Sequence, residues 1–215
     1  MKLKVYVGWD PREDIAWEVC RHSILSRTDA SKVAVIPLIQ SELRSQGFYK
    51  RAVDTRAATE FSLTRFLTPT LAAQDGYDGM AVFVDCDFLF VTDILDVLGE
   101  IDPTKAVSVV KHDYQPTEAV KMDGCVQYPY PRKNWSSVVL WNCGQFSNRI
   151  LTRQFVTEAP GDFLHRFQWL KDEQIGELPQ EWNALELEQD TTRAKLVHYT
   201  IGVPGFLHYA NGGKD

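Results

Sequence analysis

Two carboxylates, Asp85 and Asp87, directly follow the apolar, strand-forming run at residues 81–84. Residues two apart on a strand share a face, so both side chains can point the same way while Cys86 points into the packing. Carboxylates this close repel each other, and a divalent cation or a raised pKa of one carboxyl group relieves the repulsion. A D-x-D pair alone is most often part of a turn. The apolar residues that follow at 88–90 favour a functional pair here.

Three chemistries could use such a pair. A calcium loop of the EF-hand type does not fit, because it needs an oxygen ligand in place of Leu89 and a glycine in place of Phe90. A metal-dependent phosphohydrolase of the haloacid-dehalogenase kind would use Asp85 as its nucleophile, but it wants Thr or Val at position 89 and normally carries the motif at the start of the chain. The third chemistry is glycosyl transfer, in which the pair holds a cation against the diphosphate of a nucleotide-sugar. A catalytically silent nucleotide-sugar binder would need the same pair.

The elements around the pair predict an α/β fold. Apolar runs bounded by turns predict strands, and several are short and unalternated, as in a buried parallel sheet. Ligands of open α/β sheets bind at the carboxyl ends of the strands, where the D-x-D pair lies. The predicted strands are 3–7, 32–38, 81–84, 105–110, 136–141 and 194–199. The predicted helices after the first are 57–67, 148–158 and 162–170.

The first helix is predicted to follow a turn at residues 8–10, with Asp10 as its N-cap. Its apolar stripe would face the sheet. The stripe consists of Ile15, Ala16, Val19, Cys20 and Ile24. Residues 113–134 are loop-like and carry a basic pair, Arg132 and Lys133, and loops of this length in compact domains are usually functional.

Composition narrows the function further. A chain of 215 residues suits one domain, 1–215, and the formal charge of −6 argues against a sequence-independent nucleic-acid binder. The four cysteines form no C-x-x-C pair, so neither a disulfide framework nor a structural zinc site is indicated. No apolar stretch approaches the roughly 20 residues of a membrane span, and the start of the chain has no signal-peptide core. We therefore expect a cytoplasmic protein without a membrane span.

Beyond these patterns, five segments resemble, in order, those of glycosyltransferases related to family 8, the glycogenin-like and bacterial lipopolysaccharide galactosyltransferase-like group. They include a helix with an arginine, Arg65, the D-x-D segment itself, and a late histidine–glycine segment with His198. The resemblance implies the GT-A fold, a Rossmann-like, mixed but mostly parallel sheet flanked by helices. The five segments are residues 61–69, 81–94, 138–146, 172–185 and 197–205.

The resemblance also implies an activity: metal-dependent transfer of a sugar from a nucleotide-diphosphate sugar, with UDP as the expected nucleotide, to a sugar or other hydroxyl acceptor with retention of configuration. It implies that Asp85, Asp87 and His198 hold Mn²⁺ or Mg²⁺. Two carboxylates and one imidazole suit Mn²⁺, whereas Mg²⁺ and Ca²⁺ prefer sites made of oxygen ligands alone.

The remaining site residues are implied by the same resemblance. For Arg65 a structural salt bridge to the D-x-D loop and a ligand contact are both open. Asn142 and Gly144 are expected to end a strand beside the metal site. The expected contacts to the donor or acceptor in catalysis are Asn142, Asp172 and Gln174, in addition to the two aspartates. The expected contacts to the nucleotide part of the donor are Gly8, Trp9, Asp10, Arg65, Asp85, Cys86 and Gly202.

One departure from the family concerns charge. The family usually has a lysine before a late Pro-Trp pair, and this lysine meets the diphosphate; here Val203 precedes Pro204 and no tryptophan follows. The candidates to replace it are Lys111, Lys121, Arg132 and Lys133.

Overall fold

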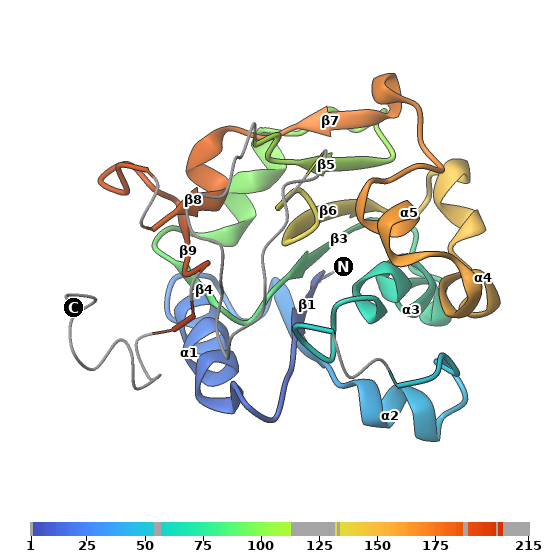
Figure 1. Cartoon of the computed structure of the whole chain (residues 1–215). Coiled ribbons are helices and arrows are strands. Elements are labelled where there is room, and N and C mark those ends of the chain that lie inside the picture. Colours follow the sequence, from blue (N-terminus) through green and yellow to red (C-terminus); the bar gives the residue numbers. More distant parts are fainter. Residues whose placement is uncertain are drawn as a thin grey trace.

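The computed structural model of this chain describes residues 2–53, 57–112, 132, 134–186, 189–200 and 202–203. Its main sheet has six strands in the order β2-β1-β3-β6-β5-β7 (Figure 1). All pairings are parallel except those of β6, which runs antiparallel to both of its neighbours. The predicted mixed, mostly parallel sheet is confirmed. The strands are β1 (Leu3–Gly8), β2 (Val33–Leu38), β3 (Met80–Val84), β5 (Val107–Val109), β6 (Val138–Asn142) and β7 (Ile175–Glu177).

A second, three-stranded sheet has the order β4-β9-β8. It contains β4 (Phe88–Phe90), β9 (Leu196–His198) and β8 (Ala184–Leu185). β4 follows β3 after the D-x-D residues and pairs antiparallel with β9, so that Phe88 lies opposite His198. Five predicted strands belong to the main sheet, and the sixth is β9.

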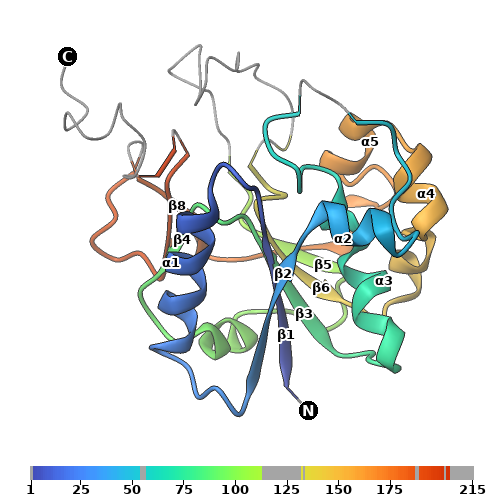
Figure 2. The same ribbon diagram turned by 90° about the horizontal axis from the view of Figure 1, so that it is seen from below.

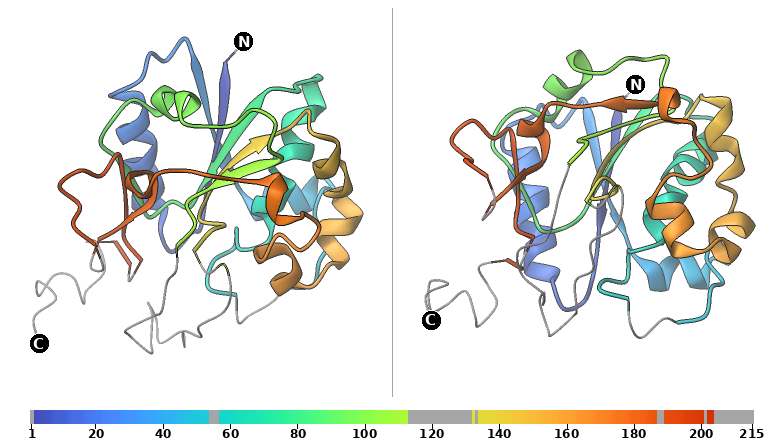
Figure 3. Two further views of the ribbon diagram at one scale, coloured as in Figure 1. Left: turned by 90° about the horizontal axis from the view of Figure 1, so that it is seen from above. Right: turned by 45° about the horizontal axis from the view of Figure 1, so that its top comes forward.

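The helices cover both faces of the main sheet. α1 lies on one face beside the second sheet, and α3, α4 and α5 lie on the other (Figure 2; Figure 3). The α-helices are α1 (Asp14–Leu25), α2 (Gln40–Ser45), α3 (Thr68–Ala72), α4 (Arg153–Glu158) and α5 (Gly161–His165). The 3₁₀ segments include Thr64–Leu67, Ala73–Asp75, Ile94–Gly99, Phe146–Ile150, Asp172–Gln174 and Gln180–Asn183.

The core explains the unalternated strand pattern. Because helices or the second sheet cover both faces, every residue of 81–84 is buried. Trp141 of β6 packs edge-on against Phe66 with ring centroids 6.3 Å apart, and it stacks on Trp169 at 6.4 Å.

Two helix predictions need correction. The stretch 57–67 forms turns and a 3₁₀ segment instead of an α-helix, and its hydroxyls bond locally, as between Thr59 and Ser62 at 3.3 Å. The predicted stripe of α1 also fails in part, because Ile15 is 72% exposed and Val19 49% exposed. Among the described helices, none is long and apolar enough to cross a membrane.

Candidate active site

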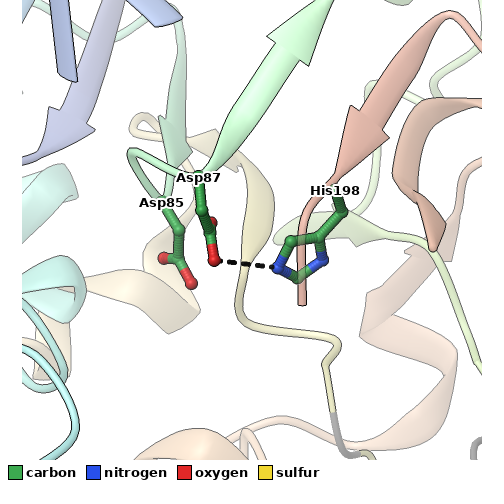
Figure 4. Close-up of side chains that lie close together, drawn as sticks. All are labelled: Asp85, Asp87 and His198. Atoms are coloured by element: carbon green, nitrogen blue, oxygen red, sulfur yellow. Dashed lines mark ion pairs between the residues drawn. The ribbon is translucent and has the colours of Figure 1, made fainter. Parts of the chain in front are cut away.

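The metal-binding residues predicted from the sequence meet at the carboxyl end of β3. Each of Asp85, Asp87 and His198 offers one ligand atom, and these three atoms lie within 4.8 Å of one another (Figure 4). Two backbone bonds position them: the Asp85 N–H donates to the Ser137 carbonyl at 3.0 Å, and the Asp87 carbonyl accepts from the Tyr199 N–H at 3.0 Å. The pairing of β4 with β9 thus brings His198 to the aspartates from more than a hundred residues away.

The orientation of the His198 ring follows from a chain of hydrogen bonds. The Ser137 hydroxyl donates its proton to the Asn134 carbonyl at 2.7 Å, so its oxygen accepts from the Asn183 amide nitrogen at 3.0 Å. The amide oxygen of Asn183 then faces Nδ1 of His198, 2.9 Å away, and accepts a hydrogen bond from it. The other ring nitrogen, Nε2, lies 3.5 Å from Oδ2 of Asp87 and so points toward the carboxylates.

The imidazole is also held by packing. His198 is 3% exposed, and its ring stacks on Phe88 with centroids 4.1 Å apart and planes inclined by 21°. A ring fixed by both a hydrogen bond and a stacking partner presents Nε2 in one direction, as a metal ligand must.

Arg65 holds the first aspartate. Its guanidinium lies 2.8 Å from Oδ1 of Asp85 and donates to the Ser136 carbonyl at 2.8 Å. The group is 5% exposed and sits over the rings of Phe61 and Phe83, with centroids 5.4 and 4.9 Å away. Of the two roles open for Arg65, the salt bridge to the D-x-D loop is the one that this geometry realises.

Gly8 makes room for this arrangement. A Cβ atom added at Gly8 would lie only 2.5 Å from the ring of Phe61. The glycine therefore lets Phe61 pack on the end of β1, and Phe61 in turn supports Arg65. This close approach accounts for the glycine by packing, without a nucleotide contact.

The three ligand residues line a cleft of about 260 Å³. Among the described residues of its wall, three carboxyl groups (Glu13, Asp85 and Asp87) face one guanidinium, that of Arg65. Burial, and then the negative charge of Asp87, raise the pKa of Glu13 to about 7. An excess of carboxylates together with an imidazole nitrogen that points toward them is a donor set that fits a divalent cation.

A larger cavity of about 530 Å³ adjoins the cleft, and Thr59, Ser62 and His165 line both. Nδ1 of His165 lies 2.8 Å from the Ser136 hydroxyl. Burial, and then the positive charge of Arg65, lower the pKa of His165 to about 3, so the ring is neutral at pH 7. Gln40, Arg44 and Tyr49 line the far side of this cavity.

Asp10 and Trp9, both predicted to contact the nucleotide, line two different cavities. Asp10 is fully buried in the wall of the larger cavity, where its carboxylate accepts from the backbone and side chain of Arg12 and from the Glu60 N–H. It closes a turn and does not cap the helix, whose N-cap is Glu13. Trp9 lines a separate depression with Trp17 on the other side of the turn.

Two further predicted residues lie near the aspartates. Gly202 lines the cleft at φ 123°, a conformation that favours glycine, and its N–H donates to the Tyr199 carbonyl at 3.1 Å. Cys86 points into the packing as predicted, is 1% exposed, and its thiol lies 3.5 Å from the Glu13 carboxylate.

Asn142 and Gly144 are not beside the metal site. Because β6 is antiparallel to β3, Asn142 pairs with Met80 at the start of β3, at the opposite edge of the sheet. There the Asn142 amide donates to the carbonyls of Pro103 and Lys105. Gly144 is needed for packing, since an added Cβ would lie 2.8 Å from the Asp78 carbonyl. The expectation failed because β6 runs antiparallel to β3, so its carboxyl end lies away from the carboxyl end of β3.

Gln174 shares that opposite edge, where its amide donates to the Ser147 hydroxyl at 2.6 Å and accepts from the Lys171 N–H at 2.9 Å. Asp172 is exposed and pairs with Arg132. Neither Asp172 nor Gln174 is among the described residues that line the cleft.

Neither of the two described cation candidates, Lys111 and Arg132, lines the cleft. Arg132 donates to Asp172 and to the Arg166 carbonyl, and Nζ of Lys111 lies 4.0 Å from Glu177. Lys121 and Lys133 lie outside the described residues, as does most of the predicted 113–134 loop.

The sequence analysis missed three residues of the site. Glu13 and His165 belong to no motif, and only the fold brings them to the cleft. Asn183 lies within the resembling segment 172–185, directly after Trp182, and that position in the segment was the available signal.

No family model matches the chain. Protein CDI of Arabidopsis thaliana is 51% identical over 210 residues, which are 95% of this chain and 80% of that protein. This chain belongs to the protein CDI family. The name of the relative says nothing of an activity, so the chemistry has to be inferred from the site and the fold.

The solved structures that the chain resembles are glycosyltransferases of the GT-A fold. The apo structure of the bifunctional glycosyltransferase WbbM matches with a TM-score of 0.57 at 14% identity, over 92% of this chain and 45% of WbbM. Mouse xyloside xylosyltransferase 1 matches with a TM-score of 0.57 at 11% identity, over 95% of this chain and all of that one. Galactosyltransferase LgtC, solved with donor and acceptor sugar analogues, matches with a TM-score of 0.50 at 11% identity, over 92% and 87% of the two chains. At such identities the likeness shows the fold.

Proposed function

We propose that this member of the protein CDI family is a metal-dependent glycosyltransferase. It would move a sugar from a nucleotide-diphosphate sugar, with UDP as the nucleotide, to a hydroxyl acceptor, with retention of configuration. The observation that carries the proposal is the cluster of Asp85, Asp87 and His198 at the carboxyl edge of a GT-A sheet. The GT-A fold of the similar structures supports it.

The cleft and the adjoining cavity suit the two parts of such a donor. The cleft around Asp85 and Asp87 would take the diphosphate and its cation, and the cavity reached past His165 would take the nucleoside. Neutral hydrogen-bonding groups separate the two spaces, namely Thr59, Ser62 and His165. Such groups can bind sugar hydroxyls without adding charge.

Mn²⁺ or Mg²⁺ held by Asp85, Asp87 and His198 would supply Lewis-acid stabilisation of the leaving diphosphate. The chain's own residues do the rest. Arg65 holds the Asp85 carboxylate in place, and Asn183 holds the His198 ring so that Nε2 points toward the aspartates. In the transfer, the acceptor oxygen bonds to the anomeric carbon, the bond from that carbon to the diphosphate oxygen breaks, and the diphosphate takes the electron pair and the hydroxyl proton.

Titration of UDP into the protein, with Mn²⁺ or with EDTA, tests the donor site. We expect UDP to bind in Mn²⁺ and its affinity to fall by about a hundredfold or more in EDTA, because the cleft is otherwise lined with carboxylates. Equal affinity in both solutions would contradict the proposal.

A second assay separates an enzyme from a silent binder. Release of UDP from a panel of UDP-sugars, with and without simple glycosides as acceptors, is expected for a transferase. Binding of UDP without any release would indicate a nucleotide-sugar-binding module. Release of phosphate from simple phosphomonoesters would indicate the phosphohydrolase instead.

A further inference from the structure

An apolar groove lies on the other side of the metal cleft from the cavity assigned to the nucleoside. It has a volume of about 370 Å³ and lies between α1 and β4. We call it the α1 groove and define it by its apolar wall, which consists of Ile15, Ala16, Val19, Phe88, Leu89 and Val203.

The α1 groove is continuous with the metal cleft. Glu13 and Asp87 line both, and Asp87 is one of the three proposed metal ligands. The cavity assigned to the nucleoside is lined from α2 and α5, by Arg44 and His165, whereas the groove is lined from α1. These helices cover opposite faces of the main sheet (Figure 2; Figure 3). A molecule in the groove would therefore reach the reacting atoms without crossing the donor.

A ligand in the groove would cover the exposed apolar side chains of α1. Ile15 and Val19 lie one helical turn apart and are 72% and 49% exposed, although packing of α1 on the sheet would predict a polar outer face. A space of this size, mostly apolar with polar groups at one end, has the character of a small-molecule site. Glu13 and Asp87, at the polar end, are shared with the metal cleft, and Arg12 lines both the groove and the cavity assigned to the nucleoside.

We propose that the α1 groove binds the apolar part of the acceptor. The acceptor class is then an amphipathic hydroxyl compound, such as an alkyl or aryl glycoside, whose hydroxyl reaches past Asp87 while its alkyl or aryl group lies against Ile15 and Val19. The assignment of the bound molecule as the acceptor rests on the proposed function. The binding of an apolar group in the groove can be tested independently.

The probes are hexyl and methyl β-D-glucopyranoside, which differ only in apolar length. Their binding to the full chain is measured by calorimetry without UDP or metal and then with both. We expect hexyl glucoside to bind about tenfold tighter or more, because its additional methylene groups leave water for the groove. Equal affinities of the two glycosides would overturn the proposal. UDP binding in Mn²⁺ is measured in a separate titration. Loss of UDP binding would contradict the proposed function, whereas equal glycoside affinities would contradict only the assignment of the groove.

A pair of variants locates the binding. Ile15→Gln with Val19→Gln changes two exposed side chains of the groove and is expected to lower the affinity for hexyl glucoside to that of methyl glucoside. Val91→Gln is the matched control, because Val91 is 42% exposed but outside the groove, and its affinities should equal those of the wild type. Unchanged hexyl glucoside binding in the double variant would overturn the proposal.

Two other occupants give distinct results. If the full chain is a dimer in sedimentation and the double variant is a monomer, the groove is an interface between copies. If Phe206→Ser with Leu207→Ser strengthens hexyl glucoside binding about tenfold, the chain beyond Val203 fills the groove. Either result would overturn the acceptor assignment.

Discussion

The two edges of the main sheet differ more than the sequence suggests. At the carboxyl end of β3, Asp85, Asp87 and His198 converge on one cleft with neighbours that fix their orientation. At the other edge, polar residues of similar type, Asn142 and Gln174, bond to the backbone and to one hydroxyl and face no cleft that contains the metal ligands.

Residue type and position after a strand do not define a site until strand direction is known. Asp85 ends a strand parallel to β1, and Asn142 ends one that runs the other way. Ser136 and Ser137, which precede β6, reach the cleft in place of Asn142. Substitutions at the carboxyl edge should therefore have larger effects than matched substitutions at the opposite edge.

The largest expected effect is on stability. Arg65→Met leaves the Asp85 carboxylate without its buried partner and should lower the free energy of unfolding by about 3–5 kcal/mol. Lys105→Met at the opposite edge removes an exposed pair with Asp102 and should cost about 0–1 kcal/mol. Urea unfolding without metal measures both. Equal costs would mean that the Arg65 pair is no more important than a surface contact.

The metal ligands come next. Asp87→Asn and His198→Ala should each weaken binding of Mn²⁺ in the presence of UDP by about a hundredfold, since each removes a ligand of the proposed site. Asn142→Ala and Gln174→Ala should change it by less than about twofold, because neither lines the cleft. Electron paramagnetic resonance of Mn²⁺ measures the affinities. Wild-type binding by His198→Ala would exclude the metal-site assignment.

A smaller effect tests the hydrogen bond that orients His198. Asn183→Leu keeps the volume but removes the acceptor for Nδ1–H, and should weaken Mn²⁺ binding by about tenfold or more. Asn183→Asp keeps an acceptor and should restore most of the affinity. Asn148→Leu is the control: Asn148 is equally buried and bonds to carbonyls at the opposite edge. If both Leu variants lose stability but keep Mn²⁺ affinity, Asn183 is merely structural.

A further effect is a pH dependence from His165. Its pKa is about 3 when folded and near 6.5 when unfolded, so the unfolded state takes up the proton first. The contribution to stability is present above pH 6.5 and is lost as the pH falls toward 3, by at most about 1.4 kcal/mol per pH unit. In urea unfolding at pH 7 and pH 5, His165→Gln should lose less stability than the wild type. Gln174→Ala should follow the wild type, and a His165→Gln slope equal to the wild type would contradict the burial of a neutral ring.

Much of the fold could be predicted because buried strands have a recognisable pattern of apolar residues in the sequence. The unalternated apolar runs located six strands, since strands covered on both faces are apolar throughout. The helix at 57–67 was wrong because periodicity does not register hydroxyls such as Thr59 and Ser62 that bond within turns. The exposure of Ile15 and Val19 on α1 could not be predicted for a related reason. An apolar stripe has the same sequence pattern whether or not a sheet covers it.

The sequence by itself determined the D-x-D pair and the strand that carries it, because residue chemistry and apolar patterning are properties of short segments. The choice of His198 as a partner came from the resemblance to family 8-related glycosyltransferases. Only the tertiary structure decided which residues share the cleft. The register of β4 against β9 brings His198 to Asp87, the reversed direction of β6 removes Asn142, and packing around Phe61 places Arg65 on Asp85. Strand direction and register depend on contacts between distant segments, and a pattern read along one segment does not contain them.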